Sequence, residues 1–169
     1  VKIGTKTLPY AEFGTIFKGK VEQANWDEQN IILRLRNSEP LLDVNIQETE
    51  YLGTGGLEGG DSLLGVSKPL CYGSCSNVSP ILVDENNLIY QVHDGSVSSI
   101  AAVYFNGVPA VYNSDYTINN TNGTITALTS TAGVVVTADV LGDNSSEGYI
   151  SNTSDIIKRI IKDKAGFAD

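Results

Sequence analysis

Residues 13–36 carry the clearest alternation of apolar and polar side chains in the chain. Two apolar runs flank the sequence ANWDEQN, which has the composition of a turn. The second run alternates between two sets of side chains, namely Ile31, Leu33 and Leu35, and Ile32, Arg34 and Arg36. Because successive side chains of a strand point to opposite faces, this pattern predicts a β-hairpin with one buried face. We assign residues 1–50 to an N-terminal β-hairpin part, with a further short strand expected at residues 41–46.

From residue 80 onward, short apolar and β-branched runs recur with turn sequences between them. They include ILV, NLIYQVHD, SIAAVYFNGVPAVYN and GVVVTADV. The pairs Asn106–Gly107 and Asn122–Gly123 each predict a hairpin, because Asn and Gly adopt the positive φ angles of tight turns. Five to seven short strands of this kind predict a small β-sandwich or barrel over residues 79–151.

The C-terminal residues 152–169 change to helical spacing. One stripe is formed by Ile156, Ile157, Ile160 and Ile161, with Lys158, Arg159 and Lys162 opposite. We expect Ser154 to cap the helix at its start and Gly166 to end it. Since a helix of about three turns is marginal by itself, the isoleucine stripe should pack on another surface. We expect that surface to be the β domain of the same chain, and the alternatives are a C-terminal continuation of the chain or a neighbouring subunit. The overall expectation is a mainly β protein with one short C-terminal α-helix.

Residues 51–78 interrupt this periodicity and contain the sequence YLGTGGLEGG. Its glycines, which we expect to form a connecting loop, are Gly53, Gly55, Gly56, Gly59 and Gly60. A phosphate-binding loop needs a Lys–Ser/Thr pair that is absent here, and a dinucleotide fingerprint needs glycine where Glu58 stands. Glu58 and Asp61 would also place negative charge beside a phosphate. The segment is therefore interpreted as a flexible connection or an ordered surface loop.

The charge and the apolar content of the chain limit the kinds of molecule that it is expected to bind. The chain of 169 residues has 11 basic and 20 acidic residues, a net charge of −9, which disfavours nucleic acid and anionic lipid as partners. No run approaches the roughly 20 apolar residues of a membrane helix. The sequence contains no Met, and we expect it to be a fragment of a longer polypeptide in which the last helix continues.

Few residues could carry chemistry. Cys71 and Cys75 could close a disulfide if the chain turns back, but a zinc site would need further ligands, and the chain has one histidine, His93, and no other cysteine. Asp94 adjoins His93 but should point to the opposite strand face, and no Gly-x-Ser-x-Gly motif is present. We expect reduced thiols, no catalytic residue, no cofactor and no metal.

Several stretches together resemble tail-tip and baseplate proteins of tailed bacteriophages. They are TIFKGKVEQANWDEQNIILRLRNSEPLLDVNIQ, YLGTGGLEGG, SKPLCYGSCSNVSPILVDENNLIYQVHDG and VYFNGVPAVYNSDYTINNTNGTITALTSTAGVVVTADVLG. The resemblance implies a structural component of a phage or prophage virion tail, assembled in the bacterial cytoplasm. Its partners would be other tail proteins in a symmetric oligomer, and it would not be an enzyme.

Two alternatives stay open. The first is a carbohydrate- or receptor-binding β module on a surface, with stacking faces supplied by Trp26, Tyr104, Tyr112 and Tyr116, whose ordinary role would be strand packing. The second, less favoured, is an enzyme built from dispersed carboxylates.

Overall fold

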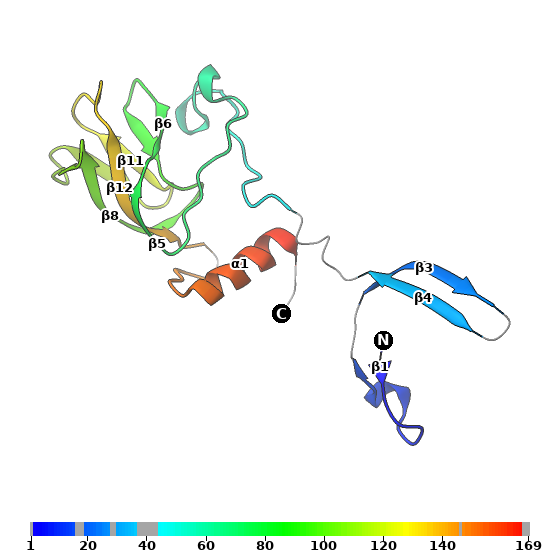
Figure 1. The fold of residues 1–169 in the computed structure, drawn as a ribbon. Helices are drawn as coiled ribbons and strands as arrows, with labels where there is room; N and C mark the ends of the chain where they lie inside the picture. The colour runs from blue at the N-terminus through cyan, green and yellow to red at the C-terminus, as the bar shows by residue number, and fades with distance from the viewer. Residues whose placement is uncertain (1, 16–18, 28–29, 37–43, 146, 167–169) are drawn as a thin grey trace. The chain divides into compact units, whose positions relative to one another are not determined.

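The computed structural model describes residues 2–15, 19–27, 30–36, 44–145 and 147–166. Contacts between Cα atoms divide the chain into two compact units, one comprising residues 1–45 and 161–169 and the other residues 46–160. Each unit is described by itself. Figure 1 shows the ribbon with its strands and its one labelled helix.

The N-terminal unit is made of two small antiparallel pairs of strands. Strand β1 (Lys2–Ile3) pairs with β2 (Gly14–Thr15), and a 3-10 turn, η1 (Tyr10–Glu12), lies between them. Strand β3 (Lys20–Trp26) pairs with β4 (Ile31–Arg36).

The hairpin expected around ANWDEQN is thus present. Its turn is closed by two bonds, in which the amide of Asp27 donates to the carbonyl of Asn30 and the amide of Asn30 donates to the carboxylate of Asp27. Of the strand expected at residues 41–46, positions 41–43 lie outside the described residues. Val44 and Ile46 lie in bends, and Asn45 has no regular secondary structure.

The larger unit contains two four-stranded antiparallel sheets. The first has the order β10-β11-β7-β6 and the second the order β5-β12-β8-β9. Their bounds are β5 Ser74–Val78, β6 Ile81–Asp84, β7 Ile89–Gln91, β8 Val97–Phe105, β9 Val108–Pro109, β10 Tyr116–Asn119, β11 Thr124–Ala127 and β12 Val136–Asp143. The fold is mainly β and sandwich-like with a C-terminal helix, as the sequence predicts.

Side chains from both sheets form the core of this unit. On β12 the burial alternates strictly, so Val136, Ala138 and Val140 point inward. They meet residues such as Ile125 of β11 in one buried apolar cluster. This period-2 burial is what the run GVVVTADV indicates.

Both Asn–Gly hairpins are confirmed, with different loops. At Asn106–Gly107 the φ angles are 53° and 79°, and Phe105 pairs with Val108, so β8 and β9 are joined by a two-residue turn. At Asn122–Gly123, Asn119 pairs with Thr124, so four residues lie between β10 and β11.

Residues 51–78 differ from the expected connection, because they belong to the larger unit. The division of the chain falls between residues 45 and 46. Two 3-10 turns, η3 (Gly56–Glu58) and η4 (Asp61–Leu63), follow each other, and the amide of Tyr51 donates to the carbonyl of Val66. Four of the five glycines have positive φ, between 59° and 93°, and Gly60 is extended. The segment is an ordered loop closed on itself, and its last five residues are β5.

Helix α1 (Thr153–Ala165) follows the sandwich. Its cap is Asn152 and not Ser154, since the Asn152 side chain accepts a bond from the Ser154 amide at 2.9 Å. Gly166 does end the helix, with φ 66° and its amide bonded to the carbonyl of Lys162. No helix among the described residues has the length and apolar character needed to cross a membrane.

The face of α1 that the sequence predicts to be buried is only partly so. Ile157 is 53% exposed, whereas Arg159, expected on the opposite side, is the most buried residue of the helix at 2%. The expectation for Arg159 is therefore wrong. Its long side chain reaches polar partners at the end of β12, described below.

Gly123 occupies a position that only glycine fits. A Cβ there would stand 2.6 Å from the carbonyl oxygen of His93 and 2.8 Å from that of Gly95, and φ is 58°. Gly133 has a similar φ of 71° but open space around it. Gly133→Ala should thus cost about 1–2 kcal/mol of unfolding free energy for the backbone alone. Gly123→Ala should cost about 1–3 kcal/mol more through overpacking.

Urea unfolding of the two variants, followed by circular dichroism, measures this difference. Equal losses of stability would show that the chain around His93 and Gly95 yields freely.

Candidate functional site

A buried ionic cluster joins the end of β12 to helix α1. The Arg159 Nη1 atom lies 2.9 Å from Asp143 Oδ2 and donates to Ser145 Oγ at 3.1 Å. Its Nη2 donates to the carbonyl of Gly148 at 3.2 Å, and its Nε lies 3.4 Å from a Glu147 carboxylate oxygen. The guanidinium is thus surrounded by acceptors supplied by residues 143–148.

His93 lies on the other side of Asp143 and is 3% exposed. Its Nδ1 accepts a bond from the backbone amide of Cys71 at 2.9 Å, so a neutral ring must carry its proton on Nε2. That atom faces Asp143 Oδ1 at 3.6 Å. Burial lowers the pKa of His93, and the charges of Asp143 and Asp94 oppose the shift. The carboxylate that faces the ring is therefore Asp143, whereas Asp94 contributes through its charge.

The thiol beside this histidine is a poor nucleophile. Both cysteines are free, and Cys71 Sγ contacts the carbonyl of Val92 at 3.2 Å. Burial, together with the nearby Cys75 thiol, raises the pKa of Cys71 to about 12. Because the thiolate is the reactive form, Cys71 stays in its unreactive form at neutral pH. Cys75 Sγ contacts the carbonyl of Tyr72 at 3.4 Å.

A second ionic cluster fastens the glycine-rich loop. Lys68 Nζ, almost completely buried, lies 2.6 Å from Glu58 Oε1 and 3.8 Å from Asp94 Oδ1, and it stands over the ring of Tyr51. The Tyr51 hydroxyl bonds to Gln91 Oε1 at 2.6 Å, and burial raises the pKa of Tyr51. The hydrogen bond from Lys68 lowers the pKa of Glu58. The ammonium of Lys68 is thus already matched by carboxylates.

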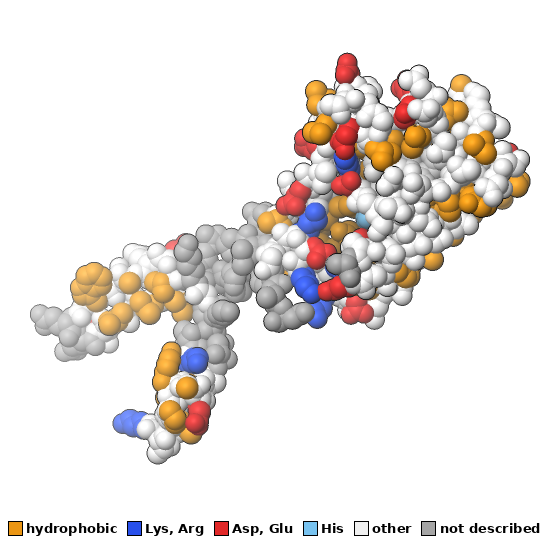
Figure 2. All heavy atoms as spheres, turned by 180° about the vertical axis from the view of Figure 1, so that it is seen from behind, with side chains coloured by type: hydrophobic (Ala, Val, Ile, Leu, Met, Phe, Trp, Pro, Cys, Tyr) orange, Lys and Arg blue, Asp and Glu red, His pale blue; other side chains and the backbone are white. Residues whose placement is uncertain are grey.

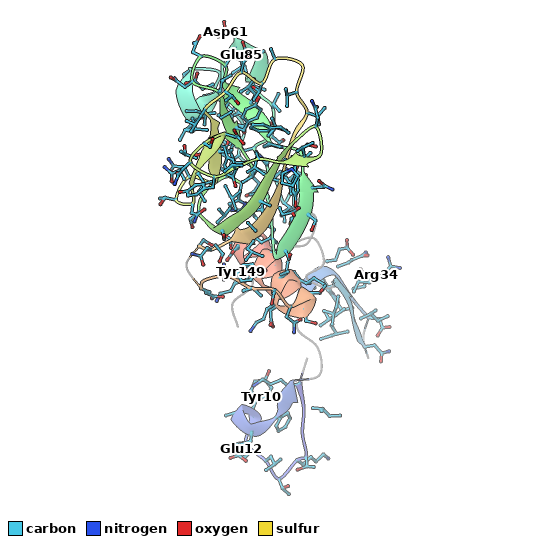
Figure 3. All side chains as sticks on the ribbon, turned by 90° about the vertical axis from the view of Figure 1, so that its left-hand side faces the viewer. Tyr10, Glu12, Arg34, Asp61, Glu85 and Tyr149 are labelled. Carbon is cyan, nitrogen blue, oxygen red and sulfur yellow. The ribbon has the colours of Figure 1, made fainter. Side chains whose placement is uncertain are left out.

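The glycine-rich loop also borders a polar hollow of about 340 Å³ beside strand β6. Asp61 and Glu85, labelled in Figure 3, lie at the same end of the sandwich, and both line the hollow. Asp84 also lines it, but its carboxylate accepts bonds from the Asn87 side chain and from the backbone amides of Asn87 and Asn86, which lower its pKa. Within the described ranges, no group of three or more His, Cys, Asp and Glu could hold a metal ion.

The four aromatic residues considered for ligand stacking have different surroundings. Trp26 belongs to the N-terminal unit and is 80% exposed, whereas the three tyrosines belong to the sandwich. Tyr116 is buried, and its ring meets the ring of the half-exposed Tyr112 edge-on at 5.7 Å. The Tyr104 hydroxyl donates to Asp139 Oδ2 at 2.8 Å. The tyrosines therefore have the packing and strand contacts of structural residues.

Hairpin β3–β4 presents a continuous apolar face. Residues directly opposite in an antiparallel pair point to the same side of it. The register pairs Val21 with Leu35, Ala24 with Leu33 and Trp26 with Ile31, and a bulge near Gln23 keeps the two ends in phase. We call these six residues the apolar face.

The opposite side of the hairpin is mainly polar. It carries Gln23, Asn25, Arg34 and Ile32, and the side chains of Gln23 and Asn25 are hydrogen bonded to each other. The sequence prediction of a one-faced hairpin is thus confirmed. The prediction that this face is buried is wrong for the described structure, because Ile31 is 74% exposed, Val21 50%, Leu33 49% and Leu35 37%. Figure 2 shows hydrophobic side chains gathered along this hairpin.

Two features escaped the sequence reasoning. The pairing of β3 residues with β4 residues was not visible because the bulge breaks the alternation of β3 near Gln23. The roles of Arg159 and Asp143 were missed because their partners come from other segments. The position of Arg159 within a run of isoleucines was the one available signal.

Comparison of the chain with protein-family models, curated proteins and solved structures finds no match.

Removing Arg159 should destabilise the sandwich strongly. Truncation leaves the Asp143 carboxylate without its cationic partner, and breaking a buried pair costs about 3–5 kcal/mol. Arg159→Ala should therefore lower the unfolding free energy by about that amount. Lys158→Ala, which removes a charge at the exposed neighbouring position, should change it by about 1 kcal/mol or less, the range of surface ion pairs. Equal urea midpoints for the two variants would show that the cluster does not hold the helix.

His93 should make stability depend on pH. Its pKa is lower in the folded chain than the value of about 6.5 expected after unfolding, so the unfolded state binds the proton more readily. This contribution to stability is present above about pH 6.5 and is lost as the pH falls. The parent should lose more stability on acidification than His93→Gln does, as measured by urea unfolding across the pH range. Parallel profiles for the two proteins would exclude His93 as the source.

Proposed function

We propose that the chain is a structural component of a phage tail tip or baseplate and acts by protein–protein contacts in a symmetric assembly. The observation that carries the contact part of this proposal is the exposed apolar face of hairpin β3–β4. The assignment to a tail rests on the resemblance of the sequence.

An exposed face of this kind needs a cover. A two-stranded hairpin is at best marginally stable in water without a further layer. Full burial of a Val, Leu or Ile side chain is worth roughly 1.5–3 kcal/mol, and here three such residues, Val21, Ile31 and Leu33, are about half exposed or more. Contiguous exposed apolar surface marks an interaction site in soluble proteins. Contact with another subunit supplies the missing layer.

The buried clusters of the sandwich fit a structural role as well. Arg159, Asp143 and His93 are occupied with one another, and Lys68 is matched by Glu58 and Asp94. These groups tie loops and the helix to the sheets. They support a rigid sandwich, which suits a structural role.

Binding of a carbohydrate is the second candidate, and the exposure of Trp26 favours it. The indole is 80% exposed and free to stack on a sugar ring. However, its neighbours across and along the hairpin are Ile31, Leu33 and Ala24. They offer no hydrogen bonds for sugar hydroxyls, so the surroundings of Trp26 suit protein packing better. Saturable sugar binding that is lost in Trp26→Ala would favour the carbohydrate module.

The contact proposal predicts that a charge on the apolar face blocks assembly. Leu33→Asp places a carboxylate on that face, and the matched control Ile32→Asp places it on the opposite, polar side at the next position. Burying an unpaired carboxylate costs several kcal/mol, so incorporation of Leu33→Asp should fall by about tenfold or more, with Ile32→Asp close to the parent. The measurement is complementation of a host whose own copy of the gene is deleted.

Particles are then purified and labelled with an antibody against the sandwich. Labelling at the tail end by the parent and by Ile32→Asp supports the proposal. If the chain stays with free protein in every fraction, or if Leu33→Asp is incorporated like the parent, the proposal fails.

A further inference from the structure

The net charge of the chain is confined to one of its two units. Residues 46–160 contain 12 acidic and 3 basic residues, which accounts for the whole net charge of −9. Residues 1–45 and 161–169 together contain 8 acidic and 8 basic residues. Copies of the sandwich therefore repel each other, whereas copies of the N-terminal unit meet no net repulsion.

The apolar face itself carries no charge. Homodimer interfaces are more apolar than interfaces between transient partners, and charges across an interface contribute to the choice of partner. None of the six residues of the apolar face is charged or strongly polar. A surface with these properties complements another surface of the same kind, including its own copy.

The sizes of the side chains change along the face. Trp26 and Ile31 lie at the turn end, Ala24 and Leu33 in the middle, and Val21 and Leu35 at the other end. A twofold axis through the middle pair would place the bulky end of one hairpin over the smaller end of the other. This arrangement gives both ends of the contact the same mixture of large and small side chains, with the Ala24–Leu33 pairs meeting at the axis.

From these observations we infer that the apolar face packs against the same face of a second copy of this chain. The inference rests on the proposed function and names the partner in that contact. The two hairpins form two layers of two strands, about 10 Å apart. The contact is isologous, the commonest form of symmetric association.

Trp26 reports on this contact directly, because it is the one tryptophan of the chain. In a free copy it is exposed, and its emission should resemble that of indole in water. Packing against a second copy removes water and shifts the emission to the blue. The shift should follow the fraction of dimer over about 1 μM to 1 mM, a range that covers weak to moderate association.

The experiment combines tryptophan emission with sedimentation equilibrium on the full chain. The parent and Ile32→Asp should both associate to dimers, with the blue shift and the dimer mass appearing together. Leu33→Asp should stay monomeric and red-shifted, with the same urea unfolding of the sandwich as the parent. Added salt should strengthen association of the parent, because it screens the repulsion between the acidic sandwiches.

Three outcomes would overturn the inference. The first is a parent that stays monomeric with red-shifted emission throughout the range. The second is a monomer whose emission is already blue-shifted, since the face would then be covered by its own chain. The third is a dimer that Leu33→Asp leaves intact. A monomeric parent whose Leu33→Asp variant still fails to enter particles would refute self-association and leave the proposed function standing, with a different subunit as the cover.

Discussion

The C-terminal part of the sandwich depends on the contacts that the Asp143 carboxylate makes with two buried side chains. It stands at the end of β12 between Arg159 Nη1, at 2.9 Å, and His93 Nε2, at 3.6 Å. Neither a guanidinium nor a carboxylate can be buried alone without a large desolvation cost. Their mutual presence allows both to be buried and so joins α1 to the end of β12 next to His93. The backbone of Cys71 completes the link, because its amide fixes the His93 tautomer.

A buried cation paired with a carboxylate is also found at the glycine-rich loop. Glycines lose more conformational entropy on folding than other residues, so a loop with many of them needs specific fastening. The loop between Tyr51 and Lys68 obtains it from the Lys68–Glu58 pair and from the buried Tyr51 ring. Both junctions thus use a buried cation, Arg159 in one and Lys68 in the other, that is paired with a carboxylate.

Local patterns predicted those parts of the fold that local interactions determine. The Asn106–Gly107 turn and the Gly166 helix end need only their own φ angles, and both were predicted correctly. Strand β5, in contrast, has the sequence SCSNV without alternation, and it is a strand because β12 pairs with it. The glycine-rich loop and the burial of Arg159 depend in the same way on partners distant in sequence. Ser154 and Asn152 are both residue types that can cap a helix. Because the helix begins at Thr153, the capping residue is Asn152, the residue before it.

The existence of the apolar face could be predicted from the sequence, but its exposure could not, because exposure depends on which other segments pack on it. Alternation in β4 indicates that a strand has an apolar side, but it does not indicate what covers that side. On β12 the cover is the opposite sheet of the same unit, whereas on β4 the apolar residues stay exposed. The distribution of charge supplies information that alternation lacks. Since residues 46–160 carry the whole net charge and the other unit carries none, close approach of two copies costs less electrostatic free energy at the hairpin than at the sandwich.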